Sequence, residues 1–83
     1  MRSTVNAAYV REIKWTIRLN ETEIGERAGF ASGYISRLLD EENPGDVRLS
    51  TIDRLYEAIA GRMMELGQNP PDDLWIRLIR QEA

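Results

Sequence analysis

The sequence predicts an all-α fold: a compact bundle of about five short helices that form a single domain over residues 1–83. Three observations support this prediction. Apolar residues recur at helical spacing in several segments. Residues that favour helix starts or helix ends stand at the borders of these segments. No stretch shows a convincing alternation of apolar and polar residues, which is typical of a β-strand.

The expected helices are placed by their apolar stripes and by their caps. Asn6 or Ser3 is the candidate cap of the first helix. Asn20 and Glu23 have the spacing of a capping box, so a second helix is expected to begin directly after Asn20. Gly29 is expected to end that helix. The five segments are residues 6–19, 21–28, 32–39, about 50–66 (which Gly61 could divide) and about 71–82.

The composition excludes several kinds of site. The chain contains no Cys and no His, which removes disulfides, the usual zinc ligands and the most common general base. We therefore expect no catalytic activity, no metal and no cofactor. No apolar run approaches the roughly 18 residues of a membrane span, and the first residues lack the apolar core of a signal peptide. These features predict a cytoplasmic protein.

Charge is distributed unevenly along the chain, although the net charge is only −3. Residues 1–37 carry six basic and four acidic side chains, whereas residues 38–83 carry five basic and ten acidic ones. The basic excess is therefore confined to the N-terminal part, where it favours contacts with an anionic partner. Because the excess is small, we expect a shallow salt dependence for such contacts.

Residues 21–40 carry the pattern on which the functional prediction depends. Gly25 lies in the middle of the second expected helix, where glycine costs about 1 kcal/mol relative to alanine. A residue without a side chain at this position lets the following helix approach closely. Two short helices that cross steeply then share a small core, as in a helix-turn-helix. The members of this core are Ile24, Ala28, Phe30, Ile35 and Leu38.

This segment resembles the helix-turn-helix of the phage repressors, the family of lambda repressor and Cro. The family has an apolar and then a small residue in its first motif helix, a glycine in the turn and apolar anchors in the second helix. Here these positions are Ile24, Gly25, Gly29, Ile35 and Leu38. The resemblance covers about residues 8–61, and residues 62–83 form a helical extension outside it. The chain departs from the family at Glu21, where a Gln that supports a phosphate contact is common.

The resemblance implies that residues 32–39 form a recognition helix, which lies in the major groove of double-stranded DNA. Arg37 is the bidentate donor on its outer face and suits guanine, although it could instead pair with Asp40 or Glu41. The serines could instead be a cap and a solvated hydroxyl, and Tyr34 could be half-buried packing. The candidate base contacts are Ser32, Gly33, Ser36 and Arg37, and the candidate phosphate contacts are Thr22, Tyr34, Lys14, Arg18, Asn43 and Arg48.

The C-terminal stripe has two interpretations; it consists of Leu74, Trp75, Leu78 and Ile79. It either completes the core of the monomer or faces a second copy, with Trp75 as the anchor. We favour a homodimer, because two-fold pairing places two recognition helices on half-sites about one turn of DNA apart. Trp15 lies off the apolar stripe of the first helix, and we expect it to pack against the last helix or to join the same interface.

These residues predict a sequence-specific transcriptional regulator of the repressor type that binds double-stranded DNA without a cofactor. The alternative is a protein-interaction module, such as the antitoxin of a toxin–antitoxin pair, in which DNA binding is secondary. In that alternative the acidic residues 38–83 engage a basic protein partner. A gel shift that compares the wild type with Arg37→Ala distinguishes the two hypotheses.

Overall fold

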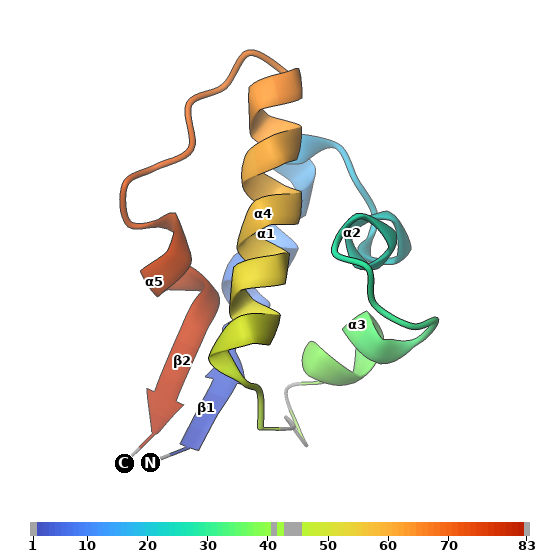
Figure 1. The fold of residues 1–83 in the computed structure, drawn as a ribbon, viewed down its shortest axis with the longest axis vertical. Helices are drawn as coiled ribbons and strands as arrows, with labels where there is room; N and C mark the ends of the chain where they lie inside the picture. Colours follow the sequence, from blue (N-terminus) through green and yellow to red (C-terminus); the bar gives the residue numbers. More distant parts are fainter. Residues whose placement is uncertain (1, 41, 43–45, 83) are drawn as a thin grey trace.

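The computed structural model describes residues 2–40, 42 and 46–82 (Figure 1). In this part of the chain, five helices and two short strands follow one another. Their bounds are β1 Arg2–Val5, α1 Ala7–Ile17, α2 Glu21–Arg27, α3 Tyr34–Leu38, α4 Leu49–Glu65, α5 Leu74–Leu78 and β2 Ile79–Glu82. The prediction of an all-α bundle of about five helices is therefore confirmed in part: the fold is mostly helical, with five helices in the described part of the chain.

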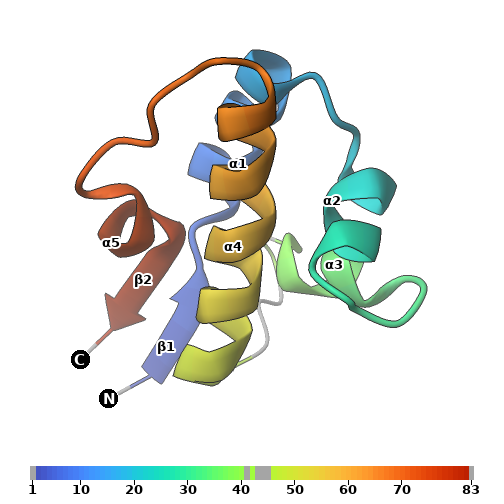
Figure 2. The ribbon, with the colours of Figure 1, turned by 45° about the horizontal axis from the view of Figure 1, so that its top comes forward.

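The long helix α4 lies at the centre of the molecule, with α1 behind it (Figures 1 and 2). Helices α2 and α3 flank α4 on one side, and α5 and the two strands flank it on the other. Gly61 lies inside α4 and does not divide it. The buried side of α4 meets the buried sides of the other helices in one hydrophobic cluster, which includes Val10, Ile17, Ile24, Leu39, Ile52, Leu55, Ile59, Leu74 and Leu78.

The two ends of the described chain form a small β-sheet, which corrects the prediction of an entirely helical fold. Strands β1 and β2 are antiparallel, with Val5 opposite Ile79. The amide of Asn6 donates a hydrogen bond to the carbonyl of Leu78 at 2.9 Å and continues the pairing beyond the strands. Sequence patterns missed the sheet because each strand has only four residues and the two strands lie at opposite ends of the chain.

The last helix is shorter than predicted. The prediction of a helix over about residues 71–82 is wrong at both ends: α5 begins at Leu74, after a turn, and ends at Leu78, where β2 begins. Leu74 and Leu78 keep their helical spacing and are fully buried. From Ile79 onwards, pairing with β1 satisfies the backbone groups that another helical turn would otherwise satisfy. The predicted C-terminal stripe is therefore divided between a helix and a strand.

The caps fix where α1 and α2 begin. The side chain of Asn6 accepts a hydrogen bond from the amide of Tyr9 at 3.3 Å, so Asn6 caps α1, whereas Ser3 lies in β1. Asn20 and Glu23 form both hydrogen bonds of a capping box, at 2.8 and 3.1 Å. The predicted start of α2 is therefore confirmed, and the turn from α1 to α2 is held by local contacts.

Candidate nucleic-acid interface

Helices α2 and α3 pack closely at Gly25. A Cβ atom at this position would lie 3.1 Å from Cγ2 of Ile35, which is tighter than side chains normally allow. Ile24, Ile35 and Leu38 are buried around the contact. The amide of Phe30 donates to the carbonyl of Gly25 at 2.9 Å and returns the chain from α2. The prediction that Gly25 lets the following helix approach closely is therefore confirmed.

Helix α3 begins later than predicted. Gly33 has a φ of 81°, in the left-handed region, which is incompatible with a helical position. Ser32 and Gly33 therefore belong to the turn before α3, and the predicted helix over residues 32–39 shortens to Tyr34–Leu38. The amide of Tyr34 donates to the carbonyl of Ala31 at 3.0 Å, which closes this turn.

The four predicted base-contacting residues, Ser32, Gly33, Ser36 and Arg37, are all exposed. Ser32, Gly33 and Ser36 line a hollow of about 320 Å³ between α2 and α3. Arg37 lies in the last turn of α3. Within the described part of the chain, no hydrogen bond or ion pair reaches its side chain, so Arg37 does not pair with Asp40. Glu41, the other suggested partner, lies outside the described residues. The structure therefore brings small polar side chains and one available guanidinium to the same surface.

Thr22 and Tyr34 are the two uncharged phosphate candidates in the α2–α3 segment, and their surroundings differ. Thr22 is exposed at the start of α2 and lines the same hollow as the serines. Tyr34 is half-buried, and its ring meets that of Phe30 edge to face, with 5.1 Å between the centroids. Packing therefore accounts for the ring of Tyr34, and its contact with a phosphate stays a prediction.

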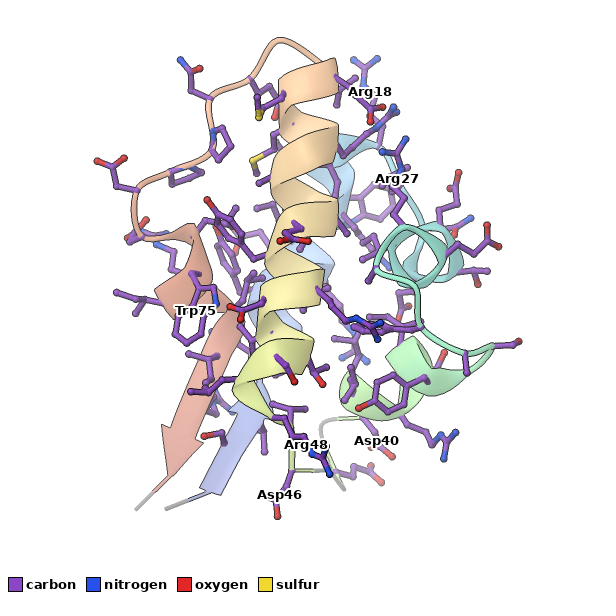
Figure 3. The ribbon with its side chains drawn as sticks, viewed as in Figure 1. Arg18, Arg27, Asp40, Asp46, Arg48 and Trp75 are labelled. Carbon is purple, nitrogen blue, oxygen red and sulfur yellow. The ribbon has the colours of Figure 1, made fainter. Side chains whose placement is uncertain are left out.

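The basic phosphate candidates occupy separate places. Arg18 and Arg48 are exposed and lie towards opposite ends of the molecule in Figure 3. Lys14 is partly covered, and its Nζ lies 3.6 Å from a carboxylate oxygen of Glu21. Glu21 thus compensates part of the charge of Lys14 within the protein. Asn43, the remaining phosphate candidate, lies outside the described residues.

An ion-pair network that no sequence pattern predicted joins α2 to α4. Two guanidinium nitrogens of Arg27 donate to the carboxylate of Glu65 at 2.6 and 3.0 Å. Arg62 lies 3.4 Å from the same carboxylate and donates to the carbonyl of Ile17 at 3.0 Å. Hydrogen bonds from Arg27 lower the pKa of Glu65. No local pattern could reveal this network, because Arg27 and Glu65 are 38 positions apart.

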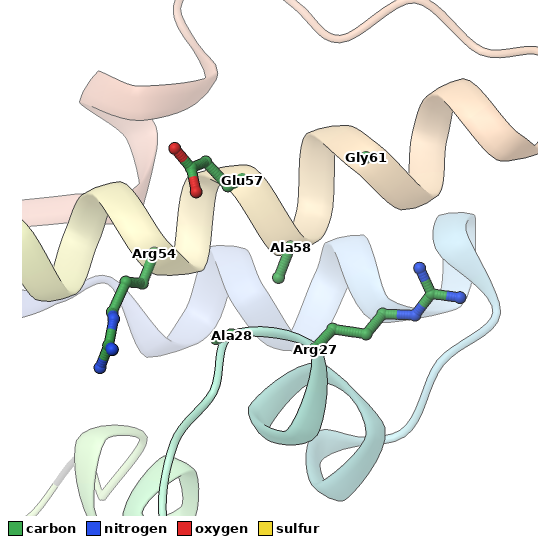
Figure 4. A pocket seen from close by; sticks show the side chains of 6 residues that line it. All are labelled: Arg27, Ala28, Arg54, Glu57, Ala58 and Gly61. Carbon is green, nitrogen blue, oxygen red and sulfur yellow. The ribbon is translucent and has the colours of Figure 1, made fainter.

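Another hollow, of about 310 Å³, lies between the end of α2 and the middle of α4 (Figure 4). Small residues line it, among them Ala28, Ala58 and Gly61. The side chains of Arg27 and Arg54 extend away from each other at its rim. Since these charged groups do not converge, the hollow lacks the clustered polar groups of a small-molecule site.

The C-terminal stripe is divided between the core and the surface. Leu74 and Leu78 are fully buried within the monomer. Trp75 and Ile79 are half-buried against the same core. The indole nitrogen of Trp75 donates to the carboxylate of Asp53 at 2.7 Å, which orients the ring beside α4 (Figure 3). Leu74 and Leu78 thus belong to the core of the monomer, whereas Trp75 and Ile79 are still partly accessible.

Trp15 stands apart from both the core and the last helix. Its side chain is 79% exposed on α1, and Lys14 Nζ lies 5.8 Å from the centroid of its ring. The prediction that Trp15 packs against the last helix is therefore wrong. The apolar stripe of α1, formed by Val10, Ile13 and Ile17, is buried, and Trp15 lies off that stripe.

Among the described residues, no cluster of three or more acidic side chains could hold a metal ion. None of the helices in this part of the chain has the length and apolar character needed to cross a membrane. Comparisons with protein-family models, curated proteins and solved structures found no match for the chain. Function is therefore inferred from the residues and the geometry of the α2–α3 surface.

Proposed function

We propose that the protein is a sequence-specific regulator that binds double-stranded DNA and represses transcription in the cytoplasm. In this proposal α2, the following turn and α3 act as a helix-turn-helix of the lambda repressor and Cro type. Helix α3 enters the major groove, and the residues at its outer face contact base edges. The proposal includes no cofactor and no catalytic step.

The observation that carries this proposal is the available guanidinium of Arg37 on the exposed face of α3. An arginine presents a rigid set of donors that matches O6 and N7 of guanine. No described acidic side chain competes for it. The contact between Gly25 and Ile35 holds the apolar face of α3 inwards, so the opposite face, with Ser36 and Arg37, is directed outwards.

Small residues in the turn before α3 and on α3 itself favour close approach to DNA. Ser32, Gly33 and Ser36 are exposed and surround the hollow beside α2. Their side chains would leave base edges accessible, and the two serine hydroxyls would donate to or accept from bases or phosphates. Thr22 and Tyr34, at the border of this surface, are the nearest proposed phosphate contacts.

Arg18 and Arg48 support a placement of the DNA backbone on both sides of α3. A duplex with a helix in its major groove presents one phosphate strand on each side of that helix. The two arginines lie towards opposite ends of the molecule, and α2 and α3 project between them (Figures 1 and 3). Lys14 contributes less in this proposal, because Glu21 already compensates its charge.

We further propose that the DNA-binding unit is a homodimer. Leu74 and Leu78 are used in the monomer core, so the second copy would contact Trp75, Ile79 and the neighbouring Ile76, whose side chain is 68% exposed. Two copies related by a two-fold axis would read half-sites about one helical turn apart. Sedimentation equilibrium of wild type and Ile76→Ser tests this contact: the variant should be mainly monomeric.

Selection of bound sequences from a random duplex pool tests DNA recognition directly. We expect an enriched palindromic site. On that site Arg37→Ala should weaken binding by about 1–3 kcal/mol and relax the preference at one position of each half-site. Arg80→Ala is the matched control, because it removes the same charge from an exposed position on β2, on the other side of α4 (Figure 1). Equal losses in both variants, or no enrichment, would refute base reading.

A second candidate function is a protein-interaction module of the antitoxin kind. Its support is the exposure of Leu49, Met64 and Ile76, three large apolar side chains that lie in the acidic half of the chain. In this candidate a basic protein partner covers that half, and DNA binding is secondary. Failure to shift any duplex, together with a stoichiometric complex with a basic protein encoded beside this gene, would favour it.

A further inference from the structure

The last turn of α1 and the residues after it form an unusual surface. Trp15, the most exposed large apolar side chain described, lies beside a hollow of about 400 Å³. Aromatic side chains prefer burial or a hydrogen bond, yet within the described chain the indole nitrogen of Trp15 has no such partner, whereas that of Trp75 has one. The hollow is lined by Lys14, Trp15, Arg18, Leu19 and Asn20.

The charge around this hollow is positive. Lys14 and Arg18 line it, and no acidic side chain does. The side chain of Arg18 is exposed, and within the described residues it makes no hydrogen bond or ion pair. Glu21 compensates part of the charge of Lys14, and Glu12, three residues before Trp15, lies one turn away from the hollow. The surface therefore combines an apolar platform with a positive rim.

The floor of this surface is held rigidly. Arg62 donates to the carbonyl of Ile17 at 3.0 Å, and Gln68 donates to the carbonyl of Thr16 at 3.2 Å. These contacts tie the end of α1 to α4 and to the segment that follows it. The capping box after Arg18 fixes the other side of the turn. A preorganised platform of this kind loses little entropy when a ligand binds.

We propose that this surface binds an acidic peptide segment of a partner protein. Trp15 contacts an apolar side chain of the segment, and Arg18 binds a carboxylate beside it. Lys14 contributes less, because Glu21 compensates part of its charge. Charge complementarity selects the acidic segment, and the exposed indole supplies the apolar contact that a surface ion pair alone lacks. The inference goes beyond DNA binding, because the peptide would connect the protein to another macromolecule. The surface excludes Ser32, Ser36 and Arg37 but includes Arg18, so the peptide and the DNA backbone would compete for that side chain.

The two indole N–H signals in the nitrogen-correlated NMR spectrum of the intact chain provide the test. Trp15→Phe identifies the signal of Trp15, and the signal of Trp75 is the internal control. The probe is a synthetic peptide of twelve residues that alternates Asp or Glu with Leu or Phe. We expect it to shift the Trp15 indole and the amides of residues 14–20, with a Kd of about 0.1–1 mM at low salt, and to leave Trp75 unchanged.

Two further peptides and three variants separate the contribution of charge from that of apolar contact to peptide binding. A peptide with Lys in place of the acids, and one with Ser in place of the apolar residues, should each bind at least about tenfold more weakly. Trp15→Ala and Arg18→Ala should weaken binding of the acidic peptide to a similar extent. Arg80→Ala is the matched control for Arg18→Ala, because it removes another exposed basic side chain, on β2, and should bind as the wild type does.

Several results would overturn the inference. No shift with the acidic peptide, or equal binding of the basic peptide, would show that the surface does not select acidic segments. A larger shift of the Trp15 indole with duplex DNA would assign the surface to nucleic acid. A lower sedimentation mass for Trp15→Ala than for the wild type would assign it to a second copy of the chain. Circular dichroism confirms that each variant is folded, which the exposure of the replaced side chains leads us to expect.

Discussion

Ile35 occupies the space that a side chain at Gly25 would need: a Cβ atom there would lie 3.1 Å from Cγ2 and 3.3 Å from Cβ of Ile35. Ile35 is buried and β-branched, so relief of this contact requires a shift of α3 itself. Overpacking of this kind costs about 1–3 kcal/mol, whereas alanine gains about 1 kcal/mol over glycine in a helix. We expect Gly25→Ala to lower the free energy of unfolding by about 1 kcal/mol, measured by urea denaturation.

Gly61→Ala is the control for this prediction. Gly61 is also helical, but a Cβ atom there would meet nothing within 4 Å. Gly61→Ala should therefore gain helix propensity without a cost of overpacking, and should stabilise the protein by about 0.5–1 kcal/mol. Changes of the same sign in the two variants would contradict the close packing of α2 on α3.

A second prediction concerns the left-handed backbone of Gly33. Its φ of 81° costs an L-residue about 1–2 kcal/mol, although a Cβ atom would meet nothing within 4 Å. Gly33→Ala should therefore destabilise the protein by about that amount. Gly33→Asn should cost less, because Asn tolerates this conformation better than Ala. Thermal unfolding of the three proteins checks the order; equal midpoints for Gly33→Ala and wild type would mean that α3 starts earlier than Tyr34.

The ion pair between Arg27 and Glu65 makes stability depend on pH. Hydrogen bonds from Arg27 lower the pKa of Glu65 in the folded protein, so the unfolded chain takes up this proton first as the pH falls. The contribution of the pair is therefore present at neutral pH and is lost as the pH falls below about 4.3, the ordinary value for glutamate. Glu65→Gln should destabilise the protein at pH 7 and have a smaller effect near pH 3.

Urea denaturation at both pH values measures this difference. Glu57→Gln, on the same helix, is the control, because within the described chain no ion pair or hydrogen bond reaches the Glu57 side chain. A constant difference between Glu65→Gln and wild type at all pH values would exclude the pair as its source.

Local contacts explain which parts of the fold the sequence predicts well. The capping box of Asn20 and Glu23 lies within four consecutive residues, so its spacing alone indicates the start of α2. Pairing of Val5 with Ile79 instead depends on chain ends that meet only after folding. For that reason the prediction that Ile79 is helical is wrong, although its spacing from Leu78 and Trp75 supported it.

In the candidate site, too, the sequence predicts the features that depend on local spacing and misses those that do not. The exposed position of Ser36 and Arg37 follows from the helical spacing of the buried residues beside them, Ile35 and Leu38. The shorter start of α3 depends on the backbone angle of Gly33, which sequence spacing does not specify. Likewise, nothing in the local sequence around Trp15 indicates that the last helix does not cover this side chain.

The pairing of Lys14 with Glu21 leads to the last prediction. At 3.6 Å the carboxylate compensates a cation that would otherwise attract phosphates, and it also repels them where α2 begins. Glu21→Gln removes both effects. We expect it to tighten binding to the selected duplex about fivefold, which corresponds to about 1 kcal/mol, and to make the salt dependence steeper by up to about 0.9 in log–log slope, because Lys14 then binds one phosphate.

A double-mutant cycle tests whether the tighter DNA binding of Glu21→Gln depends on Lys14. If it does, Lys14→Ala should reduce affinity more in the Glu21→Gln background than in the wild type. Glu57→Gln makes the same change of net charge on α4, and its side chain is directed away from α2 (Figure 4), so its effect should be small. Equal gains from Glu21→Gln and Glu57→Gln would attribute the effect to net charge alone. A loss of affinity in Glu21→Gln would mean that the start of α2 does not face the DNA backbone.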